Sequence, residues 1–178
     1  MINEKMPQNL LIKMDNEYLE IVDPILKNRE FLKRKLYHHH ENRSVYGHSL
    51  LVSVRSYYLA KKFGLDYRAA AIGGLLHDFY YNDWQMNKQK TPLWCAHGFV
   101  HAKEAVENSK ILFPDLMNKK IENIIKRHMF PLNFIPPFYL ESWIICLVDK
   151  YCSFEIFKSP QHLYKYIGLR KKDSDSNE

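Results

Sequence analysis

The chain has 178 residues, which is long enough for one domain with a buried core but too short for two ordinary domains, so we look for a single functional site. Hydrophobic residues make up 46% of the chain and charged residues 26%, the balance of a soluble globular protein. The net charge of +6 suits a phosphorylated small molecule or a nucleic acid, although part of it lies in two short basic runs, 33–35 and 170–172, that read equally well as solvated surface.

Membrane spans and disulfides are not expected. The longest strongly apolar run, Trp143–Val148, is far below the roughly 18 residues that a membrane span requires. The amino terminus carries scattered charges instead of an apolar signal core. Cys95, Cys146 and Cys152 form no CxxC pair, and an odd number of cysteines without a secretion signal indicates reduced thiols. We therefore expect a cytoplasmic protein without a membrane partner.

The first predicted helix begins at Asp23, an N-cap residue, with Pro24 at the first helical position, where its missing N–H is harmless. Apolar residues then recur at helical spacing as far as Leu36, and Tyr37 and His38–His40 end the helix. A run of three histidines can bind metal, but histidines at a helix C-terminus also interact favourably with the helix dipole. We expect the second role here.

Two further helices follow. One covers about Val45–Phe63, and Gly64 stands where a glycine often follows a helix C-terminus. The next runs from Tyr67 to about His77, is rich in alanine and leucine, and has Asp66 as its N-cap.

The polar and aromatic stretch 80–92 contains a proline and predicts a loop. Helices resume over about 97–108. Another helix is expected to start at Pro114-Asp115, and its apolar stripe extends to His128.

The last clear helix covers about 139–157, after prolines in 131–137 break the preceding one. Residues 169–178 have the composition of a disordered tail. The sequence has no internal repeat, no strand pattern of useful length and no Gly-rich phosphate loop. We therefore predict an all-α fold, a compact helical bundle that forms a single domain over 1–168 with its core at about 43–157.

Ionisable side chains at the ends of apolar helix faces point to a metal site, because a buried charge is unfavourable unless it is paired or bound to metal. His77 and Asp78 directly follow a run of small and apolar residues. Asp149 closes the apolar run WIICLV, His128 ends an apolar stripe, and His48 lies at one end of another helix. Ligands from separate helices commonly converge in the core of a bundle.

The order of these residues resembles the HD superfamily of metal-dependent phosphohydrolases. His48 is followed by His77-Asp78 in GGLLHDFYYNDW and then by the distant Asp149 in LVDKYCS. The resemblance covers roughly residues 43–154. It implies an HD-type helical bundle in which Asp78 is catalytic.

Superfamily members with two metals carry further histidines between the HD pair and the last aspartate. The segment AHGFVHAKEA resembles the family segment in which a histidine stands five residues before an alanine, and this puts His97 at the ligand position. His101 shares a helix face with His97, so either could bind metal while the other touches substrate. His128 matches the second intervening histidine, and Asp78 would bridge two ions. The implied metal ligands are His48, His77, Asp78, His97, His128 and Asp149.

The implied reaction is hydrolysis of a phosphate ester or anhydride in a nucleotide-like small molecule. Two cations about 3.5–4 Å apart would lower the pKa of a bridging water and neutralise charge on the phosphoryl oxygens. Imidazole and carboxylate suit iron, manganese, zinc or nickel. Lys150 beside Asp149, and Arg127 beside His128, could bind the phosphate. Arg43 occupies a position where related nucleotidases often have a phosphate-contacting arginine.

Two alternatives remain open. A mononuclear member of the superfamily would keep one metal on the ordered motif and use His97 and His128 to bind or protonate the substrate. A non-catalytic sensor would hold a nucleotide or an RNA phosphate with its positive charge, but such a binder has no need for the complete ligand set. The sequence does not predict the oligomeric state.

Overall fold

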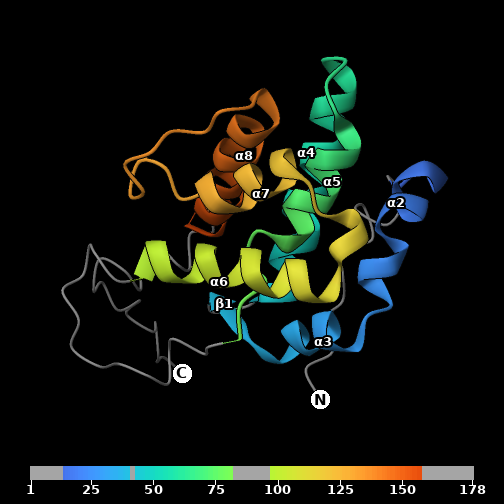
Figure 1. The fold of residues 1–178 in the computed structure, drawn as a ribbon, viewed down its shortest axis with the longest axis horizontal. Helices are drawn as coiled ribbons and strands as arrows, with labels where there is room; N and C mark the ends of the chain where they lie inside the picture. Colours follow the sequence, from blue (N-terminus) through green and yellow to red (C-terminus); the bar gives the residue numbers. More distant parts are fainter. Residues whose placement is uncertain (1–13, 41–42, 82–96, 158–178) are drawn as a thin grey trace, which may run out of the picture.

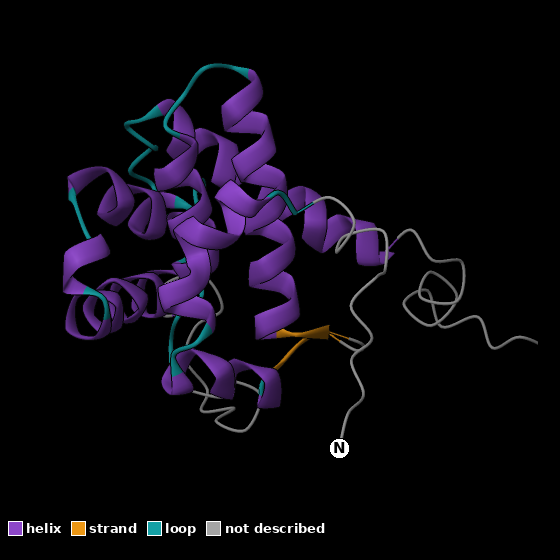
Figure 2. Cartoon of the chain, turned by 90° about the vertical axis from the view of Figure 1, so that its right-hand side faces the viewer, coloured by secondary structure: helices purple, strands orange, loops and turns teal. Residues whose placement is uncertain are grey.

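The computed structural model describes residues 14–40, 43–81 and 97–157. Of these, 38–40, 43, 97–100 and 154–157 are described by their backbone alone. This part of the chain is helical apart from one short strand pair (Figure 1, Figure 2), which confirms the predicted all-α fold. The α-helices are α2 (Asn16–Leu26), α3 (Arg29–Leu32), α4 (Val45–Lys62), α5 (Tyr67–Leu76), α6 (His97–Leu112), α7 (Lys119–Arg127) and α8 (Leu140–Phe157).

The remaining elements are short. The 3-10 helices are η1 (Lys33–Leu36) and η2 (Pro114–Leu116), and β1 (His38–His40) pairs antiparallel with β2 (Arg43–Ser44). The predicted tail, 169–178, and most of the predicted loop at 80–92 lie outside the described residues, so both stay predictions, as does the domain boundary at 168.

Helices α4, α5, α7 and α8 form the centre of the fold. The most extensive contact joins α4 to α5, and α8 packs against both of them and against α7. Helix α6 crosses the bundle on the side of α7 (Figure 1). The buried residues of these helices, together with those of α2, form one hydrophobic core. Side chains from all of the central helices therefore meet inside the molecule.

Two glycines allow α5 to lie very close to its neighbours. A Cβ atom on Gly74 would lie 2.7 Å from the Cα of Ser53 in α4, and one on Gly73 would lie 2.5 Å from Cγ2 of Ile124 in α7. Both distances are shorter than any ordinary carbon–carbon contact. Only glycine therefore fits where α5 crosses α4.

Polar caps set the boundaries of the helices that the sequence predicts well. Ser44 and Asp66 accept hydrogen bonds from backbone N–H groups in the first turns of α4 and α5. Gly64, just after α4, has a φ of 66°, the left-handed conformation that favours glycine. These features confirm the predicted helices at about 45–63 and 67–77.

Two predicted helix starts are wrong. The first helix begins at Asn16, because Asp15 is its N-cap, and Pro24 lies inside α2 near its end. Asn28 then caps a new helix, so the predicted continuous helix is divided into α2, α3 and η1, and the histidine run forms β1. Likewise, Pro114 begins only the short η2, and α7 starts after the N-cap Asn118.

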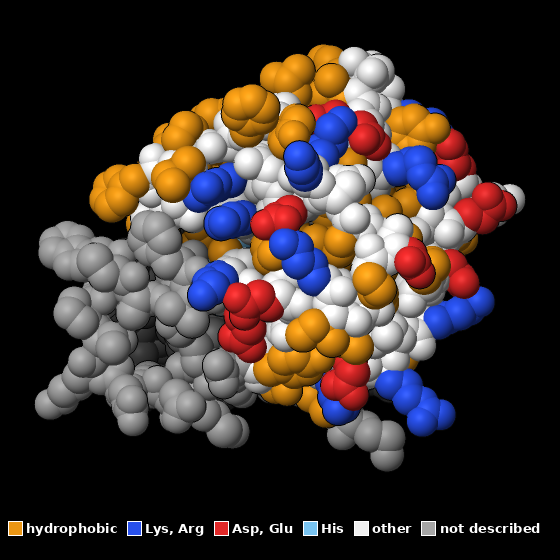
Figure 3. Space-filling model, viewed as in Figure 1, with side chains coloured by type: hydrophobic (Ala, Val, Ile, Leu, Met, Phe, Trp, Pro, Cys, Tyr) orange, Lys and Arg blue, Asp and Glu red, His pale blue; other side chains and the backbone are white. Residues whose placement is uncertain are grey.

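The surface over α8 and the preceding loop is apolar. Phe134 and Phe138 in the loop are 84% and 81% exposed, and Leu140 and Leu147 of α8 are 64% and 62% exposed. Figure 3 shows hydrophobic side chains gathered over this region, at the top and upper left of the view. None of the helices in the described ranges has both the length and the apolar character of a membrane span.

Glu141 joins three helices and gives a prediction for pH-dependent stability. Its Oε1 accepts hydrogen bonds from the backbone N–H of Asp66 at 2.9 Å and from Nζ of Lys120 at 3.0 Å. Burial raises the pKa of this carboxyl group, but backbone donors and Lys120 outweigh it and hold the pKa below its ordinary value. The ionised form therefore stabilises the fold above about pH 4.5, and this contribution is lost as the pH falls through the lowered pKa.

We expect Glu141→Gln to lower the free energy of unfolding by about 1–2 kcal/mol at neutral pH, because a charged acceptor becomes a neutral one. The variant should lose less further stability than the wild type between about pH 5 and pH 3 in thermal unfolding. Glu107→Gln, at an exposed position on α6, is the matched control and should follow the wild type. Parallel pH profiles for the Glu141 variant and the wild type would contradict the role of this carboxylate.

Candidate metal centre

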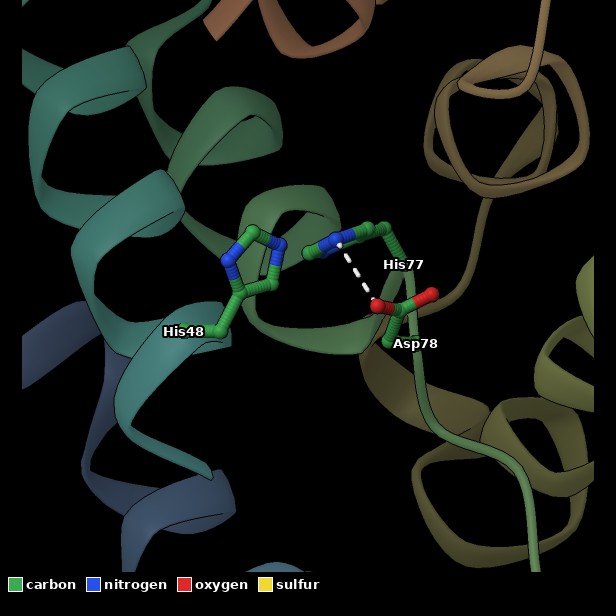
Figure 4. A group of neighbouring side chains, drawn as sticks. All are labelled: His48, His77 and Asp78. Carbon is green, nitrogen blue, oxygen red and sulfur yellow. Dashed lines mark ion pairs between the residues drawn. The ribbon is translucent and has the colours of Figure 1, made fainter. Parts of the chain in front are cut away.

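Five helices bring six ionisable side chains together at the centre of the bundle. His48 comes from α4, and the HD pair closes α5, where His77 is the C-cap. His128 is the C-cap of α7. Most of these side chains are buried, and Figure 4 shows the imidazoles of His48 and His77 beside the carboxylate of Asp78. The six residues are His48, His77, Asp78, His101, His128 and Asp149.

One group of candidate ligands lies between α4, α5 and α8. The ligand atoms of His48, His77 and Asp78 all lie within 4.8 Å of one another. Nε2 of His48 forms a hydrogen bond with Oδ1 of Asp149 at 2.9 Å. Nε2 of His77 lies 3.4 Å from Oδ2 of Asp78 and 3.6 Å from Oδ1 of Asp149. Two imidazoles and two carboxylates therefore surround one position.

A second group lies between α5, α6 and α7. The ligand atoms of Asp78, His101 and His128 also lie within 4.8 Å of one another. Oδ1 of Asp78 is 3.7 Å from Nε2 of His101 and 3.6 Å from Nε2 of His128. The two imidazole Nε2 atoms are 3.3 Å apart. Asp78 thus presents Oδ2 to the first group and Oδ1 to the second.

Helix ends hold two of the imidazoles in a ligand orientation. Nδ1–H of His77 donates to the carbonyl of Gly74 at 2.8 Å, and Nδ1–H of His128 donates to the carbonyl of Ile125 at 2.7 Å. Carbonyls in the last turn of a helix lack helical partners, so a histidine at the C-cap can satisfy one. This bond turns Nε2 towards the carboxylates, as the outer hydrogen bond of a metal-binding histidine does.

The residues fit a divalent metal ion. Nε2 of His77 is buried and has no hydrogen-bond partner, although two carboxylates face it. A buried polar atom without a partner is unfavourable, and a cation between it and the carboxylates would satisfy all three. Nitrogen and carboxylate donors without thiolate are the ligands that iron, manganese, zinc and nickel accept.

The electrostatics of the cluster also favour a cation. Burial lowers the pKa of His77, but the carboxylates of Asp78 and Asp149 outweigh burial and raise it to about 9. Burial and the neighbouring His77 lower the pKa of His128 to about 3. Burial raises the pKa of Asp149, but His48 and His77 outweigh it and keep the pKa far below its usual range. The carboxylates of Asp78 and Asp149 thus favour the positively charged form of the His77 imidazole.

The three predicted phosphate ligands lie in different surroundings. Nζ of Lys150 donates to the carbonyls of His128 at 3.0 Å and Cys146 at 3.2 Å, which ties α8 to the end of α7. Nη1 of Arg127 lies 3.5 Å from Oδ1 of Asn133 in the following turn. The side chain of Arg43 is outside the described residues. Phosphate binding by these three residues stays a prediction.

His97 and His101 differ in what the structure describes. His101 lies in the second group, at the ligand position for which the sequence left His97 and His101 as alternatives. The side chain of His97 is outside the described residues, so its predicted role is untested. The carbonyls of Gly74 and Ile125 are not among the groups that the sequence predicts for the site. Each stands three residues before a histidine that ends an apolar helix, and this spacing is the signal that could have indicated them.

An all-helical bundle with a buried cluster of histidines and aspartates defines a candidate metalloprotein. The family model of the HD domain matches residues 45–153, and the chain belongs to the HD domain family. HD domains are typically metal-dependent phosphohydrolases, and the match includes all six clustered residues. Comparisons with curated proteins and with solved structures gave no match.

Proposed function

We propose that the protein hydrolyses a phosphate ester or anhydride of a nucleotide-like small molecule in a metal-dependent reaction. The observation that carries this proposal is the position of Asp78, whose two carboxylate oxygens face two different groups of ligands. With this arrangement, Asp78 would help to hold two cations, one in each group. The net charge of +6 would favour the approach of an anionic substrate.

Two divalent ions would divide the cluster between them. The first would be held by His48, His77, Asp78 and Asp149, and the second by Asp78, His101 and His128. Bound there, they would lower the pKa of a water molecule and neutralise charge on the phosphoryl oxygens.

The chain contributes orientation and a restricted environment. Backbone carbonyls fix the rings of His77 and His128, so these side chains need not reorganise when the substrate binds. The ring of Tyr80 lies 5.6 Å from that of His101 and is nearly buried, which limits access of solvent to the second group. A dry site strengthens the electrostatic interactions with a phosphoryl group.

The proposal is tested with chelator-treated protein that is reloaded with manganese, iron, zinc or nickel. We expect metal-dependent turnover in a screen of mononucleotides, dinucleoside polyphosphates and generic phosphodiesters. His77→Ala should lose that turnover, since it removes the imidazole between both carboxylates. Absence of metal-dependent hydrolysis of all three substrate types, with metal shown to be bound, would sink the proposal.

The number of ions gives a separate prediction. We expect His101→Ala to reduce bound metal from two ions per chain to one, because the second group then keeps only Asp78 and His128. Elemental analysis of the purified variants measures this. His97→Ala is the matched comparison on the same helix, and loss of an ion in this variant alone would assign the ligand to His97. One ion in the wild type would instead support the mononuclear alternative.

A further inference from the structure

Arg34 is a buried cation without a hydrogen-bond acceptor. Arg34 lies in η1 and is 1% exposed. Its guanidinium nitrogens Nε, Nη1 and Nη2 have no hydrogen-bond partner. Burial lowers the pKa of this guanidinium from its usual value. Burying an unpaired charge is among the most unfavourable arrangements in a protein, so an anion that pairs with this guanidinium would bind favourably here.

Aromatic rings surround Arg34 but do not satisfy its donors. Its Cζ lies 4.7 Å from the ring centroid of Tyr37, 5.1 Å from that of Phe79 and 4.7 Å from that of Tyr81. The faces of these rings attract the positive charge. They accept none of the N–H groups, which form a planar fork that matches the oxygens of a phosphate or carboxylate.

The walls of this cage are continuous with the metal centre. Phe79 directly follows Asp78. The backbone N–H of Tyr81 donates at 2.8 Å to Glu104, which lies one turn beyond His101 on α6. The carbonyl of Tyr37 accepts at 2.8 Å from the N–H of Val45, one turn before His48. The cage is therefore joined by its backbone to α4 and α6, the helices that carry His48 and His101.

The neighbouring lysines are in different situations. Nζ of Lys33 lies 2.8 Å from Oε1 of Glu30, so its charge is paired. Lys35 is exposed and lies 4.7 Å from the ring centroid of Tyr46. Of the three residues in the basic run 33–35, only Arg34 is buried without a hydrogen-bond acceptor.

We propose that Arg34 binds a phosphate group of the substrate other than the one that is hydrolysed, so that the enzyme selects nucleotides with two or more phosphates. This inference rests on the proposed function. Tyr81 is 38% exposed and is the most exposed of the three aromatic residues, so a phosphate would enter on its side of the cage. The bound phosphate supplies the acceptors that the guanidinium lacks.

Binding of inorganic pyrophosphate to chelator-treated protein tests the anion site without catalysis. Titration calorimetry at constant ionic strength should show binding to the wild type that weakens about 10-fold to 100-fold in Arg34→Met. Arg34→Lys keeps the charge but loses the planar fork, so its affinity should lie between the two. Lys35→Met removes the same charge from the neighbouring residue and should bind pyrophosphate as the wild type does.

The stability of Arg34→Met separates a ligand site from a purely structural cation. A methionine of similar length in an aromatic cage should leave the melting temperature unchanged or higher without ligand, because an unpaired buried charge has been removed. A markedly lower melting temperature, or pyrophosphate affinity equal to that of the wild type, would overturn the inference.

Steady-state kinetics then show whether Arg34 binds a phosphate group of the substrate or only free pyrophosphate. For Arg34→Met, kcat/KM for a nucleoside bisphosphate should fall about 10-fold to 100-fold relative to kcat/KM for the corresponding monophosphate, mainly through KM, and Arg34→Lys should show a smaller fall. An unchanged ratio would contradict selection by Arg34 even if pyrophosphate binds there. If no substrate is turned over, the proposed function fails, and the calorimetry still decides whether Arg34 binds an anion.

Discussion

Replacing Asp78 by asparagine is expected to reduce metal-dependent hydrolysis by about 10³-fold or more and to lower the metal content of the protein. Asp78 faces both ligand groups, with Oδ2 3.4 Å from His77 and Oδ1 3.6 Å from His128. Asparagine has nearly the same shape but lacks the negative charge and one of the two acceptor oxygens. Steady-state kinetics and elemental analysis of the same preparation measure the two effects.

Asp115→Asn is the matched control for this substitution. Asp115 lies in η2, is exposed and is remote in sequence from every clustered residue, so the same chemical change there should leave activity and metal content as in the wild type. Wild-type kinetics in Asp78→Asn with both ions bound would show that Asp78 does not bridge the two groups.

Gly74→Ala should have the largest effect on stability. Without a steric conflict, alanine inside a helix would be more favourable than glycine by roughly 1 kcal/mol. Here the new Cβ would lie 2.7 Å from the Cα of Ser53, so α4 and α5 must separate. We expect a net loss of about 2–4 kcal/mol and a melting temperature lower by roughly 5–15 °C. Separation of α4 from α5 would also move His48 away from His77.

Gly64→Ala provides the comparison for that variant. A Cβ on Gly64 meets no atom within 4 Å, but its φ of 66° is unfavourable for alanine by roughly 1–2 kcal/mol. The melting temperature of Gly74→Ala should therefore be well below that of Gly64→Ala. The metal content of Gly64→Ala should equal that of the wild type. A melting temperature for Gly74→Ala at or above that of the wild type would mean that the helices pack less closely than the structure shows.

Local signals in the sequence explain which helices were predicted correctly. Asp66 and Gly64 act on the backbone beside them, so their effects do not depend on the rest of the fold. Pro24 was misleading, because it lies inside α2 although proline is favoured only in the first turn of a helix. The start of α2 is set by Asp15, whose side chain caps it.

The clustering of the site residues follows only in part from the sequence. The order of His48, Asp78 and Asp149 indicated a shared centre, and the structure brings all three together. The choice between His97 and His101 was open because residues four apart share a helix face, and only the packing of α6 against α7 determines which of them can approach His128.

The position of Arg34 could not be predicted at all. In the sequence it stands between two lysines, in a run typical of a solvated surface. Its burial results from contacts with rings that are distant in the chain, chiefly Phe79 and Tyr81, and long-range packing of this kind leaves no local pattern.

The apolar loop between α7 and α8 has a consequence for how the protein behaves in solution. Exposed side chains such as Phe134 and Phe138 attract one another between molecules, whereas the net charge of +6 keeps the molecules apart. Salt screens the repulsion, with a screening length of about 10 Å at 0.1 M, but does not weaken the attraction between apolar surfaces. Concentrated samples should therefore associate more strongly as salt is added, and low ionic strength is the condition for keeping them monodisperse.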